Sequence, residues 1–163
     1  MAVNREALFS ALFARLQAQL TTNVKSYSRR WASWDDTPPA LQPALLMLKG
    51  DEKSERKRVG TPLVWTFDLE IWLYAQDDGT AEATPSIQIN NLLQLVETAL
   101  EIQPGEATAN GAQYLARRDG PPAGTSLGGL CLSCEIVGTV KVFEGTQGHT
   151  CIVQIPVQIV ATA

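Results

Sequence analysis

The chain has 163 residues, of which 45% are apolar, and a formal net charge of -4 from 13 basic and 17 acidic side chains. This length suits one domain with its own core, so we expect a single domain over residues 1–163. The acidic balance argues against sequence-specific nucleic-acid binding, which needs a basic surface. The sequence has neither a signal-peptide pattern nor an apolar run near the length of a membrane span, so we expect no membrane partner.

The first predicted element is an amphipathic helix that begins after Asn4, a candidate N-cap, and ends near Leu20. Its apolar residues recur at spacings of three and four and form one stripe: Leu8, Phe9, Leu12, Phe13, Leu16 and Leu20. A short strand over residues 24–30 and an irregular segment over 31–43 are predicted next. Residues 44–48 form an apolar run between Pro43 and Gly50, which predicts a short strand.

A hairpin tip dense in charge is predicted at residues 50–60. Seven of its side chains are charged: Asp51, Glu52, Lys53, Glu55, Arg56, Lys57 and Arg58. Such a tip is either a solvated hairpin or a contact arm that pairs with opposite charges on a neighbouring subunit. Composition does not decide between the two, and we take these seven residues as the candidate interface.

The clearest predicted strand covers residues 62–74. A period of two places six apolar side chains on one face, which we expect to be the core: Leu63, Trp65, Phe67, Leu69, Ile71 and Leu73. A second helix is predicted from Pro85, capped by Thr84 and stopped by Pro104 and Gly105. Its predicted buried side consists of Ile89, Leu92, Leu93, Val96, Ala99 and Leu100.

The last third of the chain predicts a Gly/Ala/Pro-rich loop at 105–129 and two strands at 130–143 and 150–160. The final strand alternates, with Val153, Ile155, Val157 and Ile159 inward and Gln154 and Gln158 outward. Pro156 lacks a backbone donor, so this strand should be an edge or have a free side there. The fold class expected from this order is α+β: an antiparallel or mixed sheet of about four main strands, with two amphipathic helices packed on one face.

The sequence offers little for catalysis or metal binding. Cys131, Cys134, Cys151 and His149 could make a three-cysteine, one-histidine zinc set. However, the flanks of Cys131 and Cys134 predict a strand, which would point Cys134 inward and Cys131 outward. Three cysteines in a chain of this size favour a reducing compartment, so we expect buried thiols without metal.

The carboxylates of the long strand are also weak candidates for a catalytic or metal site. Asp68 and Glu70 share one strand face but have no third ligand at a readable spacing, so a solvated or interface face is the simpler interpretation. We therefore expect no catalytic residue, no metal and no cofactor, and we predict that the chain is not an enzyme.

The order of these features resembles the tail terminator, or tail completion, proteins of long-tailed bacteriophages. The resemblance rests on the first helix, residues 43–52 (PALLMLKGDE), the long strand with Trp65, Leu69, Trp72 and Tyr74, and residues 90–97 (NNLLQLVE). It continues through residues 127–130 (LGGL), 136–138 (IVG), the Glu144-Gly145 turn and residues 155–159 (IPVQI). It spans nearly the whole chain, although the cysteines and residues 106–124 match no feature of that family.

Membership would imply an α+β subunit that forms a ring, expected to be a hexamer, at the head-proximal end of the tail. The ring would stop growth of the tail tube and provide the surface on which the head docks. The implied partners are further copies of the chain, the tail tube protein and the head–tail connector or neck protein. The implied location is the virion tail, after assembly in the host cytoplasm. Two alternatives stay open: another neck or connector subunit, or a small ligand- or metal-binding domain.

Overall fold

The computed structural model describes residues 3–33, 35–56, 58–76, 85–107, 124–144 and 150–163. Its helices are α1 (Arg5–Leu20), α2 (Pro85–Leu100) and a single 3-10 turn, η1 (Pro39–Leu41). Its strands are β1 (Ser26–Ser28), β2 (Ala44–Glu55), β3 (Val64–Gln76), β4 (Ser133–Ile136), β5 (Lys141–Glu144) and β6 (Thr150–Thr162). Thr84, the predicted cap of α2, lies outside the described residues.

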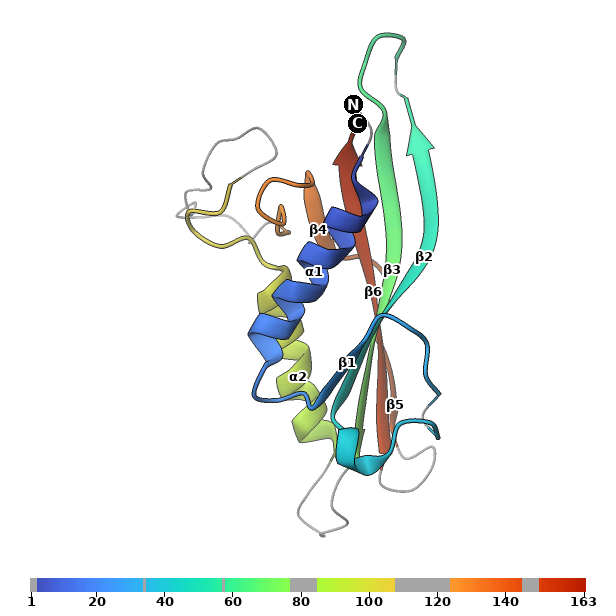
Figure 1. The fold of residues 1–163 in the computed structure, drawn as a ribbon, viewed down its shortest axis with the longest axis vertical. Coiled ribbons are helices and arrows are strands. Elements are labelled where there is room, and N and C mark those ends of the chain that lie inside the picture. Colours follow the sequence, from blue (N-terminus) through green and yellow to red (C-terminus); the bar gives the residue numbers. More distant parts are fainter. Residues whose placement is uncertain (1–2, 34, 57, 77–84, 108–123, 145–149) are drawn as a thin grey trace.

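The strands form one mixed, six-stranded sheet in the order β1-β2-β3-β6-β4, with β5 also paired to β6. The β1–β2 pair is parallel and the other pairs are antiparallel. Both α-helices lie against the same face of the sheet, and the β2–β3 hairpin extends beyond them (Figure 1). The predicted fold class, α+β with both helices on one face, is therefore confirmed, although the sheet has six strands instead of about four.

Helix α1 begins where the sequence predicted, because the Asn4 side chain accepts a hydrogen bond from the Ala7 backbone N–H at 3.1 Å. Five members of its apolar stripe are buried, and the sixth, Phe13, is partly exposed and packs edge-on against Tyr27. The predicted face of α2 is also correct, since only Leu93 of its six residues is less than fully buried. The stripes of both helices join one core with the inner residues of β2, β3 and β6.

Strand β3 is the centre of this core. It pairs with β2 on one side and with β6 along all thirteen of its residues on the other. Phe67, Leu69, Ile71 and Leu73 are buried as predicted, whereas Leu63 and Trp65 are only partly buried. Phe67, which contacts Phe9 of α1, is therefore the last fully buried residue of β3 toward the hairpin, because at Trp65 the helix has reached its first residue, Arg5.

Strand β2 is longer than predicted. It continues to Glu55, so residues 50–55 belong to a strand and not to a hairpin tip. A β-bulge interrupts its register, since Lys49 pairs with Leu69 but Glu52 pairs with Phe67. Gly50 fits this bulge because a Cβ there would lie 2.9 Å from the carbonyl oxygen of Asp68. The density of charged residues predicted a turn, but residues 50–55 can be both charged and extended. The outer half of β2 has no helix to pack against, so its side chains stay in solvent.

The strand predicted at residues 130–143 is two strands, β4 and β5, which pair with different halves of β6. Gly138 separates them with a φ of 118°, and Pro156 of β6 lies opposite the gap. The Pro156 carbonyl accepts a hydrogen bond from the Val137 N–H, so its nitrogen also points to that side. Of the two expectations for Pro156, the edge position is wrong, since β6 is internal, and the free side is correct.

A buried carboxylate that the sequence did not reveal joins three parts of the chain. Glu106, whose side chain is 8% exposed, accepts hydrogen bonds from the Thr125 and Ser126 hydroxyls and forms a 2.8 Å ion pair with Arg15 of α1. Arg15 also donates to the carbonyls of Ala99 and Glu101 at the end of α2. The pair thus joins α1, the end of α2 and the segment that leads into β4.

Burial opposes ionisation of Glu106, but the hydrogen bonds from Thr125, Arg15, Ser126 and the Gln103 N–H outweigh it and lower its pKa from 4.5 to about 2. Such a shift corresponds to about 3 kcal/mol of stability. This contribution is present above about pH 4.5 and is lost as the pH falls toward 2, because the folded state must then bind a proton that it resists.

We predict that Glu106→Gln lowers the free energy of unfolding at pH 7 by about 3 kcal/mol. The variant should also lose less stability than the wild type between pH 4.5 and 2. Urea unfolding at several pH values tests both statements. Glu101→Gln is the matched control, because Glu101 is exposed at the end of α2 and should behave like the wild type. Equal stability of the two variants would contradict the role given to Glu106.

The position at which the core ends gives a second prediction. Phe67→Ala should cost about 3–5 kcal/mol, the range for a fully buried aromatic residue, and Trp65→Ala about 1–3 kcal/mol. Thr66→Ala, on the opposite face between them, should cost under about 1 kcal/mol. Urea midpoints measured side by side test the order. A Trp65 variant less stable than the Phe67 variant would show that the core continues into the hairpin.

Candidate assembly surfaces

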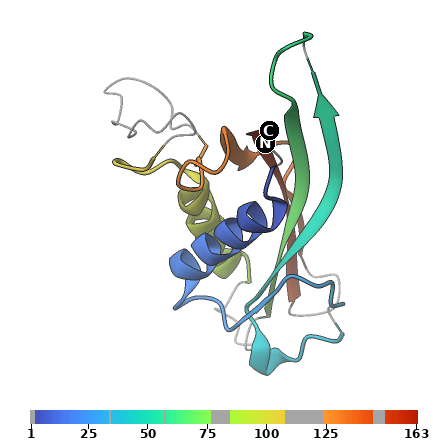
Figure 2. The same ribbon diagram turned by 45° about the horizontal axis from the view of Figure 1, so that its top comes forward.

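The outer part of the β2–β3 hairpin, residues 49–65, projects from the domain and is called the arm below (Figures 1 and 2). All of its described residues from 49 to 62 are exposed. The structure places six of the seven candidate interface residues on the arm, and Lys57 lies outside the described residues. The sequence therefore located this element, but not its strand structure.

The base of the arm is tied to α1 by a cation. The Arg5 guanidinium forms a 2.8 Å ion pair with Glu52 on β2 and lies 4.4 Å from the ring centroid of Trp65 on β3. The Trp65 ring stacks on that of Phe67, with 6.1 Å between centroids. Arg5 therefore contacts both strands of the arm, just beyond the bulge. Sequence reasoning missed this contact, because 47 residues separate Arg5 from Glu52.

The charges of the arm fall into two groups. Glu52 and Lys53 have partners within the domain: Glu52 pairs with Arg5, and the Lys53 ammonium lies 3.6 Å from the Asp68 carboxylate. Asp51, Glu55, Arg56 and Arg58 form no side-chain hydrogen bond or ion pair with any described residue. Val59, at the end of the arm, is fully exposed. The outer half of the arm thus offers acids, bases and one apolar side chain to another molecule.

The sheet face opposite the helices, called the open face below, carries a polar ladder. Gln154 donates to the Glu70 carboxylate at 2.8 Å, and Gln158 donates to Asp68 at 3.0 Å. The Trp72 indole N–H also donates to Glu70, at 2.9 Å. Both carboxylates thus accept hydrogen bonds from glutamines of β6, Glu70 also accepts one from Trp72 of its own strand, and Asp68 also lies beside the Lys53 ammonium. The sequence showed that Asp68 and Glu70 share one face of β3 and that Gln154 and Gln158 share one face of β6, but not that these faces are the same face of the sheet.

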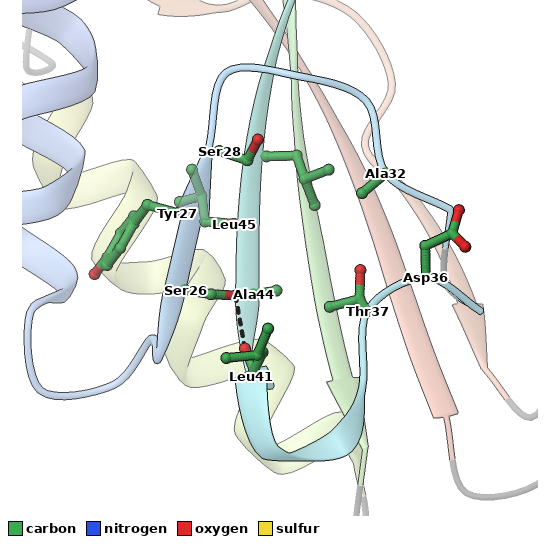
Figure 3. Close-up of a pocket in the computed structure, with 10 residues that line it drawn as sticks. Ser26, Tyr27, Ser28, Ala32, Asp36, Thr37, Leu41, Ala44 and Leu45 are labelled. Atoms are coloured by element: carbon green, nitrogen blue, oxygen red, sulfur yellow. Dashed lines mark hydrogen bonds between the residues drawn. The ribbon is translucent and has the colours of Figure 1, made fainter.

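A small hollow of about 240 Å³ lies at one end of the open face, between β1, β2 and the segment that follows β1 (Figure 3). Its polar groups are occupied locally: Ser26 donates to the Leu41 carbonyl at 2.7 Å, and Asp36 accepts from Ser33 at 2.8 Å. Figure 3 shows Tyr27 pointing away from the hollow. Ligand pockets usually measure about 300–1,000 Å³ and have convergent polar groups, so this hollow is a poor candidate for a binding site.

None of the three cysteines forms a disulfide, and all three are buried. Cys134 lies inward on β4 as predicted, but Cys131 is also buried, which corrects its predicted outward position. The reason is that β4 begins only at Ser133, so strand alternation does not extend to Cys131. Burial, and then the charge of Glu106, raises the pKa of Cys131 to about 12, and burial raises that of Cys134 well above its ordinary value.

The described residues include three of the four members of the candidate zinc set, Cys131, Cys134 and Cys151. His149, the fourth member of the candidate zinc set, lies outside the described residues. Within the residues that the structure describes, no three His, Cys, Asp or Glu side chains gather in an arrangement that could hold a metal ion. No helix in the same part of the chain has the length and apolar character needed to cross a membrane.

The fold has a counterpart among solved structures. A chain from the virion of a native gene transfer agent particle matches with a TM-score of 0.52 and 15% sequence identity, over 99% of this chain and 98% of that chain. At this identity the likeness establishes a shared fold, and it extends from end to end. No protein-family model and no curated protein matches the sequence.

We predict that all three thiols react slowly with a thiol reagent in the native protein and rapidly in denaturant. Burial keeps the reagent away from all three thiols. The raised pKa of Cys131 and Cys134 also leaves these two with little thiolate, which is the reactive form. Titration without reductant should count three thiols after denaturation, and elemental analysis should find no stoichiometric zinc. One tightly held zinc per chain, or fewer than three thiols, would contradict this.

Proposed function

We propose that this chain is a structural subunit of a phage-like particle that forms a ring, expected to be a hexamer, at the end of the tail tube. The ring ends tube growth and provides the docking surface for the head. The observation that carries the proposal is the end-to-end fold likeness to a chain of a virion particle. The ordered sequence features that resemble tail terminator proteins support the same function independently.

In this proposal the chain acts by contact and has no catalytic activity or cofactor. Its partners are further copies of itself, the tail tube protein and the head–tail connector. It is located in the virion tail and assembles in the host cytoplasm. A closed ring needs two different surfaces on each subunit, because each copy contacts one neighbour with one surface and the other neighbour with the second. The projecting arm is our candidate for the first of these surfaces.

The candidate interface of the ring is the set of charged arm residues, Asp51, Glu52, Lys53, Glu55, Arg56, Lys57 and Arg58. Four of them, Asp51, Glu55, Arg56 and Arg58, use no described residue of their own domain as a side-chain partner. Exposed ion pairs contribute only about 0–1 kcal/mol each, so these charges would set register and encounter rate more than affinity. Apolar contacts must then provide most of the binding energy.

Particles produced without this chain test the function directly. Tails of uncontrolled length without heads are expected, because nothing ends the growth of the tube. Tails of normal length that fail to join heads would instead identify a neck or connector subunit. Normal particles would exclude both. Electron microscopy of the purified chain, or of the chain bound to tubes, should show rings.

We predict that Arg56→Ser combined with Arg58→Ser leaves the free energy of unfolding unchanged within about 0.5 kcal/mol, because both side chains are exposed. The double variant should yield fewer capped tails, and the deficit should grow with salt, since screening weakens the remaining pairs. Lys25→Ser combined with Arg30→Ser removes the same charge from another exposed surface and is the control. If the arm variant caps tails normally, the arm is a solvated hairpin and not part of the ring interface.

A further inference from the structure

The two edges of the sheet differ in chemistry. Beyond the end of β1, the outer edge of β2 carries the exposed and mostly charged residues 49–55. The opposite edge is formed by β5 and by β4, whose Cys134 forms an isolated β-bridge with Thr125. Five large apolar side chains are exposed on it or next to it, each 40–47% accessible, and together they are called the apolar edge: Leu130, Leu132, Val137, Val142 and Phe143.

Strand β5 presents apolar groups on both faces of the sheet. Val142 pairs with Val153 and therefore lies on the helix face, whereas Phe143 pairs with Ile152 and lies on the open face. In the described part of the chain no strand pairs with the outer side of β5. Sheet edges in soluble proteins are usually protected by charge, bulges or a covering element. Strand β5 has charged residues at its two ends, Lys141 and Glu144, but its two central residues are apolar and exposed. Exposed apolar residues gathered at one edge are typical of a surface covered by a partner.

The charges beside this edge fit the arm of another copy. Glu135 of β4 and Lys141 of β5 are both exposed and have opposite signs. The arm offers Arg56 and Arg58 to the acid and Glu55 to the base. The exposed Val59 supplies an apolar contact next to these charges. The arm and the apolar edge thus carry charges of opposite sign and exposed apolar side chains that can pair between two copies.

We propose that the apolar edge binds the arm of a second copy of this chain, in a head-to-tail contact. The proposal rests on the ring function proposed above and names the surface that the arm meets. The contact joins two different surfaces that lie at opposite edges of the sheet, so it leaves a free arm and a free edge on every pair and can continue around a ring. Most of its binding energy comes from Val142, Phe143 and their apolar neighbours.

Two variants, each defective in one surface, test the contact in solution. The edge variant combines Val142→Asp with Phe143→Asp, and the arm variant combines Arg56→Glu, Arg58→Glu and Val59→Asp. Ile87→Asp is the control, because Ile87 is an exposed apolar residue of α2 away from both edges. Thermal melts verify folding, and sedimentation at the highest soluble concentration measures association. A milder edge variant, Glu135→Lys with Lys141→Glu, keeps the apolar residues if the first one fails to fold.

Each defective variant alone should associate at least about tenfold more weakly than the wild type, while Ile87→Asp stays within about twofold. A mixture of the two variants retains one intact contact, between the arm of the edge variant and the edge of the arm variant. It should therefore form one-to-one pairs and no larger species. Self-association of the arm variant into dimers would overturn the proposal, because the edge would then pair with itself. A monomeric wild type or an unaffected edge variant would also overturn it.

The tail assay separates this proposal from the function on which it rests. If the mixture forms one-to-one pairs but particles without the chain have normal tails, the contact stands and the tail-ending function falls. If the wild-type chain ends tails and the edge variant does so equally well, the function stands and this contact falls.

Discussion

The continuous pairing of β3 with β6 is the interaction on which the rest of the structure depends. It aligns thirteen residue pairs in one register, and this register places Phe67, Leu69, Ile71 and Leu73 on the face that α1 and α2 cover. A slip by one residue would turn these side chains to the open face and bring Asp68 and Glu70 into the core. Because a buried carboxylate without a partner is costly, the register is strongly fixed. The arm inherits its direction from the same strand, since β3 runs into it without a break.

The helices cover less of the sheet than its full length, and this incomplete cover leaves exposed the two surfaces that we propose for assembly. At the level of Arg5 the helix layer ends, and a cation over Trp65 replaces apolar packing. Beyond that level, β2 and β3 are joined by their backbone ladder, and the Lys53–Asp68 ion pair links the two strands near the base of the arm. At the other side of the sheet, β5 has apolar side chains that no helix reaches. The same domain therefore has a well-packed centre and two exposed regions, the charged arm and the apolar edge.

Periodicity in the sequence predicted the elements that bury apolar residues: both helices, β3 and β6. Periodicity did not predict the conformation of segments whose side chains are mostly exposed. Residues 50–55 are charged yet extended, because β3 provides a pairing partner that no local pattern records. The split between β4 and β5 depends on Gly138 and on the missing donor of Pro156, and the sequence shows each residue without showing that they meet. The Arg15–Glu106 and Arg5–Glu52 pairs join residues 91 and 47 positions apart, so only the fold could reveal them. The charged arm could be found from composition, whereas its partner surface could not.

The bulge at Gly50 also affects how newly made copies of the chain avoid uncontrolled association. A long, regular strand edge invites addition of another strand, and newly made subunits at high concentration would then join into open-ended fibres. An extra residue in β2, together with the charged side chains of residues 51–53 and 55, makes such indiscriminate addition unfavourable. The feature that shapes the arm thus also disfavours uncontrolled strand addition. A subunit built in this way is directed toward association through specific side-chain contacts instead of through its strand edge.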